Sequence, residues 1–394
     1  MSIPERFGKY RILKPLDGGA KGEVYLSEHE LLQAPQAAIP APDAAVTRES
    51  MTGDRTPAPS EESPEELLGA LTLACASSDE PEVLFRLGEC YEYGCGTGKD
   101  EKTAAAWYLK AAEQGYAAAQ YKLGLMYKEG RGVLRDYANA AEWFRKAADQ
   151  GHVNAQFSLG VMYDNGRGIE QDHKKAAEWF RKAADQGDAD AQFYLGWMYG
   201  NGRGVEQDDK MAVSLYRKAA DQGHANGQTN LGWMYDKGRG VEQDDKKAVE
   251  WYRKAADQGV AYAQFCLGVM YDNGRGVKQD DKKAFEWYRK AAEQGNADAQ
   301  TNLGWMYENG RGVEQDDKKA VEWYRKAADQ GDADAQFNLG WMYENGRGVE
   351  QDYKKAAEWY TKAAEQGNAD AQTNLGRMYR EGFGVPQDGA KAEE

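Results

Sequence analysis

Side chains that could carry out catalysis are few in this chain, and they follow no common spacing. A general base needs a nucleophile or carboxylate within hydrogen-bond reach, and neither recurs at a fixed distance from a histidine. The histidines occur at four positions: His29, His152, His173 and His224. The cysteines are equally irregular: Cys75, Cys90, Cys95 and Cys266. This irregularity argues against a disulfide framework and favours reduced thiols.

Metal-binding patterns are also missing from the sequence. Cys90 and Cys95 are close together, but neither a histidine nor a second cysteine pair accompanies them, as a zinc site requires. Paired acids such as Asp208 and Asp209 recur, and they suit a helix start and its dipole better than acid–base chemistry. Loops of the type D-N-G-R-G lack the ligand spacing of an EF-hand. We therefore expect no catalytic residue, no metal and no cofactor.

A strict period organises most of the chain instead. The dipeptide Leu87-Gly88 returns every 36 residues, and its glycine recurs at Gly124, Gly160, Gly196, Gly232, Gly268, Gly304, Gly340 and Gly376. The stretch 241–259 is repeated without change at 313–331. A fixed period of this length is typical of stacked structural units.

Each 36-residue unit reads as two helices. Leu195 and Met198 belong to one apolar stripe of a first helix, which Gly202 ends by adopting a left-handed conformation. Asp208 or Asp209 then caps a second helix. The stripe of the second helices contains seven tryptophans that we assign to the core: Trp107, Trp143, Trp179, Trp251, Trp287, Trp323 and Trp359. One hairpin cannot bury its stripe alone, so the hairpins must stack into an α-solenoid.

The repeated pattern L-G-x-M-Y-x-x-G-x-G-V-x-x-D, followed by K-A-x-x-W-Y-x-K-A-A-x-Q-G, resembles the Sel-one-like repeat family, a relative of the tetratricopeptide repeats. The resemblance covers about four-fifths of the chain and recurs in register. It implies an all-α fold, namely a right-handed α/α superhelical solenoid of helix–turn–helix repeats. It also implies a scaffold or adaptor for protein partners, without naming one.

The two ends of the chain differ from the repeats. Ser63 and Glu66 form a capping-box pattern, which predicts a helix over about 64–77 that covers the first repeat. Proline-rich residues without aromatics precede it and predict a disordered linker. We divide the chain into four parts: a remnant at 1–33, the linker at 34–62, a capping helix at 63–80, and the solenoid at 81–394, with eight full repeats to 368 and a partial ninth.

Residues 8–32 look like the first two strands of a protein kinase with its glycine-rich loop between them. Gly19 and Gly22 match the second and third loop glycines, and Asp17 replaces the first. The β3 lysine, the H-R-D motif and the D-F-G motif are all missing, so phosphotransfer is not expected. The segment is thus a truncated remnant, which forms either a small β-hairpin or a disordered tail.

Charge and hydropathy limit the partners. The chain has 50 basic and 65 acidic residues, a net charge of −15, and this field repels nucleic acid. No apolar stretch is long enough to cross a membrane, and the start lacks the apolar region of a signal peptide. We expect a cytoplasmic protein that binds neither nucleic acid nor membrane.

The variable positions of the first helices are the candidate partner site. A solenoid usually presents these helices on its concave surface, where aromatic anchors and amides bind a peptide. The candidate residues are Phe157, Phe193, Trp197, Asn230, Trp233, Phe265, Asn302, Trp305, Phe337, Asn338, Trp341 and Asn374. Asp190, Asp298 and Asp334 form an acidic rim beside them. Packing of the four tryptophans against the next hairpin is an equal alternative.

Three functions are compatible with these patterns. The first is a non-enzymatic scaffold that holds a protein or peptide in its concave groove. The second is a regulatory module derived from a kinase, in which the N-terminal remnant binds nucleotide or docks on a kinase. The third is an exported repeat protein that binds a host factor, against which the missing signal peptide argues.

Overall fold

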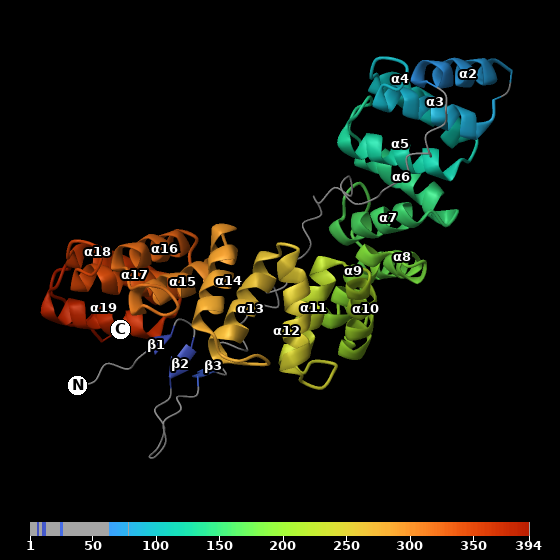
Figure 1. The fold of residues 1–394 in the computed structure, drawn as a ribbon. Helices are drawn as coiled ribbons and strands as arrows, with labels where there is room; N and C mark the ends of the chain where they lie inside the picture. Colours follow the sequence, from blue (N-terminus) through green and yellow to red (C-terminus); the bar gives the residue numbers. More distant parts are fainter. Residues whose placement is uncertain (1–5, 8–9, 13–23, 27–62, 78, 394) are drawn as a thin grey trace. The chain divides into compact units, whose positions relative to one another are not determined.

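The computed structural model describes residues 6–7, 10–12, 24–26, 63–77 and 79–393. Within them the chain forms helices α2 to α19 and three short strands (Figure 1). It divides into two units, one of residues 40–224 and the other of residues 1–39 with 225–394. Each unit is described by itself below.

The repeats are pairs of helices with 13 residues each, and this regularity confirms the all-α solenoid. The first helices are α3 (Pro81–Tyr93), α5 (Ala117–Glu129), α7 (Val153–Asn165), α9 (Ala189–Asn201), α11 (Ala225–Lys237), α13 (Ala261–Asn273), α15 (Ala297–Asn309), α17 (Ala333–Asn345) and α19 (Ala369–Glu381). The second helices are α4 (Glu101–Glu113), α6 (Tyr137–Asp149), α8 (His173–Asp185), α10 (Asp209–Asp221), α12 (Asp245–Asp257), α14 (Asp281–Glu293), α16 (Asp317–Asp329) and α18 (Tyr353–Glu365).

The helix ends follow the predicted local rules. Gly202 ends α9 with φ +66°, a left-handed conformation that glycine adopts without steric cost. Asp208, the first acid of its pair, is the N-cap of α10 and accepts the backbone N–H of Met211. Equivalent aspartates cap the other second helices, and accepting the Lys319 backbone N–H lowers the pKa of Asp316. The first acid of each pair is therefore the helix cap, and the second lies at the first position of the helix.

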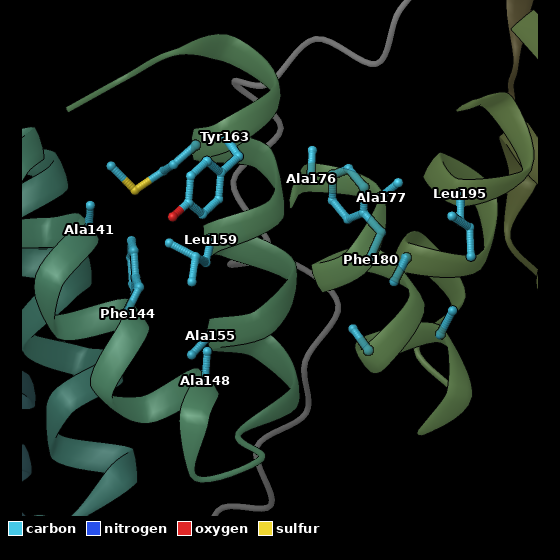
Figure 2. Close-up of a cluster of buried hydrophobic side chains, with 14 of the residues drawn as sticks. Ala141, Phe144, Ala148, Ala155, Leu159, Tyr163, Ala176, Ala177, Phe180 and Leu195 are labelled. Carbon is cyan, nitrogen blue, oxygen red and sulfur yellow. The ribbon is translucent and has the colours of Figure 1, made fainter. Parts of the chain in front are cut away.

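The core of each hairpin is a glycine of the first helix against a ring of the second. A Cβ on the recurring glycine of any complete repeat would lie 2.6–3.0 Å from that ring. The rings are Tyr108, Phe144, Phe180, Tyr216, Tyr252, Tyr288, Tyr324 and Tyr360, and all are buried. Figure 2 shows two of these rings, Phe144 and Phe180, among the alanines and leucines of neighbouring repeats. The Leu-Gly period thus marks the closest approach of two helices.

The second-helix tryptophans, assigned to the core from the sequence, lie at its edge: Trp107, Trp143 and Trp179 pack against the buried clusters without being fully buried. Trp107 and its six equivalents are only half-buried, and the tyrosine or phenylalanine that follows each of them takes the central place. A lysine three residues later lies 3.7–4.3 Å from each indole centroid, as Lys326 does over Trp323. These indoles cover the edge of the core, and the lysine shields their outer face.

Buried glutamines join each repeat to its neighbours. Gln300 of α15 donates from Nε2 to the carbonyl oxygen of Ala292 at the end of α14, at 3.1 Å. Its Oε1 accepts Nε2 of Gln330, which follows α16, at 2.8 Å. Most repeats have this arrangement. A backbone carbonyl at the C-terminal end of one helix, which has no partner within that helix, thereby accepts a hydrogen bond from the next repeat.

The ends of the array close differently. Ser63 and Glu66 form the predicted capping box, with Glu66 Oε2 accepting the Ser63 N–H at 2.9 Å. Helix α2 (Pro64–Ser77) follows, and its Leu71 packs with Leu87 and Cys90 of α3. At the other end, residues 389–393 form turns after α19.

The described part of the N-terminal region is a small antiparallel sheet. Strand β2 (Tyr10–Ile12) pairs with both β1 (Arg6–Phe7) and β3 (Val24–Leu26). Gly19 and Gly22 of the predicted kinase-like loop lie outside the described residues, and so does the predicted linker at 34–62. Nucleotide binding by this segment stays a prediction.

Candidate functional site

The candidate partner site occupies the outer side of the first helices. Its residues precede the recurring glycine by three or two positions or follow it directly, and we call this side the first-helix face. Because the glycine itself points at the second helix, the following residue is turned about 100° away from the hairpin core. In the structure Trp197, Trp233 and Trp341 are half-buried, whereas Trp305 is buried.

The four phenylalanines of the first-helix face extend the core outward. Their rings lie 5.6–6.0 Å from the buried ring of the same repeat, as Phe337 does from Tyr360 at 5.7 Å. Phe157, Phe265 and Phe337 stay half-buried, whereas Phe193 is buried and stacks on His224 at 4.9 Å. Phe193 therefore serves packing in this structure, and the other three present part of a ring to solvent.

Each tryptophan of the first-helix face lies under an arginine of the loop that follows it. The guanidinium carbon is 5.2–5.5 Å from the indole centroid, as for Arg347 over Trp341. Trp305 is only 9% exposed, and the other three are half-buried. The indole is thus held between its own helix and a cation, with only part of its surface available to a partner.

Three of these loop arginines, Arg203, Arg311 and Arg347, pair with carboxylates of the preceding repeat. Arg347 pairs with Glu308 at 3.1 Å and with Asp317 at 2.7 Å. Tyr324 Oη also donates to Glu308, at 2.7 Å. Burial raises the pKa of Glu308, and the Tyr324 hydrogen bond and the Arg347 charge oppose this rise without reversing it. A chain of contacts therefore runs from the core tyrosine through the carboxylate and the arginine to Trp341.

The asparagines and aspartates of the first-helix face differ in burial and in hydrogen bonding. Asn230 is 2% exposed, and Asn302, Asn338 and Asn374 are half-buried. The Nδ2 atom of Asn230 has no hydrogen-bond partner among the described residues. Asp334, on the predicted acidic rim, accepts Nδ2 of Asn368 at 3.0 Å.

The histidines with described side chains have structural partners. His152 Nδ1 accepts the backbone N–H of Ala155, and the ring stacks on Tyr121 at 4.7 Å. His173 contacts Asp164 at 2.9 Å. Among the described residues no group of three or more potential ligands could hold a metal ion. None of the described helices is long and apolar enough to cross a membrane.

Two polar positions escaped the sequence reasoning. The loop arginine and the glutamine after A-x-A both recur in nearly every unit, and this recurrence was the available signal. Their partners lie 30 to 39 residues away, as in Gln330 with Gln300 and Arg347 with Glu308. A pattern read one unit at a time does not reveal such pairs.

A family model described as the Sel1 repeat matches nine consecutive segments, 81–116, 117–152, 153–188, 189–224, 225–260, 261–296, 297–332, 333–368 and 369–394. The chain belongs to the Sel1 repeat family. Each matched segment begins at the first residue of a first helix, from Pro81 of α3 to Ala369 of α19. No curated protein matches the chain in sequence.

Two solved structures support the family and the fold. A Sel1 repeat protein from Oxalobacter formigenes is 35% identical, with a TM-score of 0.61 over 82% of this chain and 95% of that chain. The second is c5321, described as a protective antigen present in uropathogenic Escherichia coli strains that displays an SLR fold. It is 38% identical, with a TM-score of 0.56 over 82% of this chain and 85% of that chain.

Sel1 repeat proteins are generally scaffolds for protein–protein interaction, and their solenoid is typically non-enzymatic. The family match begins at residue 81, so it does not extend to the kinase-like segment.

Proposed function

We propose that this Sel1 repeat protein is a non-enzymatic scaffold that holds a protein or peptide partner on its first-helix face. The observation that supports this best is the row of partly exposed rings on rigid helices, such as Phe337 and Trp341 of α17. Aromatic side chains that are fixed in advance bind with little loss of conformational entropy.

Rigidity of the face supports the proposal further. Trp341 is held by Arg347, which two carboxylates fix in turn. An indole held in this way needs no rearrangement on binding, and its remaining surface can receive an apolar or cationic group. The same arrangement stabilises the stack, so the two roles assigned to these tryptophans are compatible.

A matched pair of substitutions tests the proposal. Trp341→Ala removes a ring of the first-helix face, and Trp323→Ala removes a half-buried ring of a second helix outside it. Affinity capture from native cells, followed by mass spectrometry, identifies the proteins that the unchanged chain retains. We expect Trp341→Ala to lose these proteins and Trp323→Ala to retain them. Far-ultraviolet circular dichroism of both variants verifies the fold. Equal capture by the two folded variants would contradict the face assignment.

The kinase-derived alternative has a separate test. Titration calorimetry with Mg-ATP should show no binding, because the segment lacks a lysine for the phosphates and the metal ligands. Heat of binding that disappears on deleting residues 1–62 would revive that alternative. Cytoplasmic location also remains a proposal, which fractionation of native cells tests.

A further inference from the structure

The loop after each first helix contains an arginine every 36 residues, from Arg131 to Arg347. Its carboxylate partners lie 39 and 30 positions earlier in the chain. Arg347 pairs with Glu308 at 3.1 Å and with Asp317 at 2.7 Å, and these residues occupy the two positions. The chain itself thus supplies the anions that hold these arginines.

Arg167 is the exception to this rule. Lys128 lies 39 positions before it and Tyr137 lies 30 positions before it, whereas each of the other six arginines has an acid at one or both positions. Arg167 is exposed, and the other six are half-buried. Within the described part of the chain, neither Lys128 nor Arg167 forms a side-chain hydrogen bond or an ion pair. Two cations therefore stand where the other repeats place an arginine and its carboxylate.

The next repeat shows how closely these side chains gather. There the backbone oxygen of Asp164 accepts Nε2 of Gln171 at 2.7 Å, and Nη2 of Arg203 lies 3.4 Å from the same oxygen. The side chain of Asp164 also pairs with Arg203, at 3.1 Å. The equivalent residues one repeat earlier are all cationic: Lys128, Arg135 and Arg167. Three positive side chains thus start from the same place at the end of α5.

The acids of the two loops do not balance these cations. Glu129 pairs with Arg131 at 2.6 Å, and Asp136 caps α6 through two backbone N–H groups. Glu170 follows Arg167 by three residues, but the described residues include no ion pair between them. In a chain with a net charge of −15, this place therefore carries a local excess of positive charge that favours an added anion.

An apolar side chain adjoins the cations. Leu134 is 91% exposed, and it directly precedes Arg135. The same position is glutamate in five of the six complete repeats that follow. A single exposed leucine is common on protein surfaces, but this one replaces an acid beside three cations. We call Lys128, Leu134, Arg135 and Arg167 the basic loop surface.

We propose that the basic loop surface binds an acidic segment of a protein partner. A glutamate or aspartate of that segment is held by Lys128, Arg135 and Arg167, and a neighbouring apolar side chain packs on Leu134. Charge complementarity selects this occupant, and a carboxylate is the group that the equivalent arginines hold, as Arg203 holds Asp164. At Arg167 the partner supplies the carboxylate that the chain supplies elsewhere.

This surface goes beyond the proposed function and does not require it. Residues 128–167 lie in one unit of the chain, whereas Trp341 of the first-helix face lies in the other. An acidic segment is also a selective ligand here, because the excess of acids over the rest of the chain repels it.

The test uses the full chain and a fluorescent peptide of glutamate, leucine and glycine. A twin peptide with glutamine in place of glutamate is the reference. Fluorescence anisotropy should show tighter binding of the glutamate peptide, with an affinity that falls as salt rises. We expect Arg167→Gln to weaken the glutamate peptide about tenfold, the change for one lost charge-assisted hydrogen bond.

A control with the same change of net charge lies in the other unit. Arg289 of α14 is exposed and lies 3.9 Å from Glu293. Arg289→Gln should leave the affinity of the glutamate peptide unchanged. If it weakened that peptide as much as Arg167→Gln does, the effect would be one of net charge and the proposal would fall.

A second variant separates loss of the surface from damage to the fold. Lys128→Asp gives Arg167 the carboxylate that Asp164 gives Arg203, so the internal ion pair should displace the peptide. We expect binding to fall at least tenfold while the melting temperature rises by roughly 2 °C, the shift for one surface ion pair. Adding Arg167→Gln should remove that rise. A lower melting temperature for Lys128→Asp would contradict the placement of these two side chains and overturn the proposal.

The apolar contact has its own variant. Leu134→Ser should bind the glutamate peptide about threefold more weakly, because an apolar side chain is no longer buried on binding. Its melting temperature should not change, since the side chain is 91% exposed. Unchanged binding by this variant or by folded Arg167→Gln, or equal binding of the two peptides, overturns the proposal.

One further result would assign the surface to a different partner. Co-sedimentation with phosphatidylserine vesicles that Arg167→Gln abolishes, together with equal binding of the two peptides, would indicate a membrane contact and overturn the proposal. The scaffold function is decided separately, by capture with Trp341→Ala.

Discussion

The second glycine of each G-x-G loop should be far more sensitive to substitution than other glycines with the same backbone conformation. Gly276 has φ +67°, and a Cβ on it would lie 2.2 Å from the carbonyl oxygen of Asp245. Gly295 has φ +93°, and a Cβ there would have nothing within 4 Å. The pair Gly276→Ala and Gly295→Ala therefore separates the cost of the conformation from the cost of the contact.

The expected magnitudes follow from these distances. An alanine at positive φ costs about 1–2 kcal/mol at either site. At Gly276 the start of α12 must also move by about 1.2 Å to restore an ordinary contact of 3.4 Å, and overpacking of this kind costs about 1–3 kcal/mol. The move disturbs the Arg275–Asp245 ion pair as well. We expect a total loss of about 2–5 kcal/mol for Gly276→Ala, against about 1–2 kcal/mol for Gly295→Ala.

Urea unfolding followed by far-ultraviolet circular dichroism and tryptophan fluorescence measures both variants. Stiffening of the unfolded chain by alanine is the same in the two cases, so it cancels in the comparison. A solenoid can unfold in segments, and hydrogen exchange should place the loss in the repeats on either side of the substitution. Equal losses in the two variants would refute the idea that contact with the preceding repeat selects glycine in this loop.

Three further outcomes are expected. Gln300→Leu should lower the free energy of unfolding by about 2 kcal/mol, because it leaves the buried Ala292 carbonyl without its donor and the Gln330 amide with only the Lys326 carbonyl as acceptor. Urea melts should then show that Gln330→Leu costs less in the Gln300→Leu background than in the unchanged chain. The carboxyl of Asp316, which caps α16, has a lowered pKa in the folded state, so the stability that it contributes is present above its unfolded pKa near 4 and is lost as the pH falls. The free energy of unfolding of Asp316→Asn should therefore fall less steeply at acid pH than that of the unchanged chain. Burial raises the pKa of Cys266 to about 12, so at pH 8 iodoacetamide should alkylate the exposed Cys95 and spare Cys266 in the folded protein, as peptide mass spectrometry would show.

The sequence predicted those features that depend on neighbours a few residues away. The helix pairs, the caps such as Asp208 and the left-handed glycines such as Gly202 all followed from local rules, and the structure confirms them. Assigning the core of the second helix was harder, since Trp251 and Tyr252 are adjacent and helical spacing allows both. The recurring glycine decides between them, because only the tyrosine ring meets it.

The candidate site was only partly within reach of the sequence. Periodicity located the variable positions, but burial of Phe193 and Asn230 depends on how neighbouring repeats pack. The arginine over each tryptophan comes from a loop whose direction the helix pattern does not contain. Partner binding by these residues stays a prediction that the proposed variants test.

The recurring glutamine pairs, such as Gln300 with Gln330, have a consequence for how the gene can change in length. Each pair joins two glutamines that are 30 positions apart within one repeat. The first glutamine of the pair also donates to a backbone carbonyl only eight residues earlier, at the end of the preceding helix. The segments 241–259 and 313–331 are identical, so crossing over between them would remove two whole repeats. On either side of such a deletion, every glutamine pair would still have an equivalent hydrogen-bond partner. The interactions that hold the stack together therefore tolerate the errors of recombination that repeated sequences invite, and closely related genes should differ by whole multiples of 36 codons in this region.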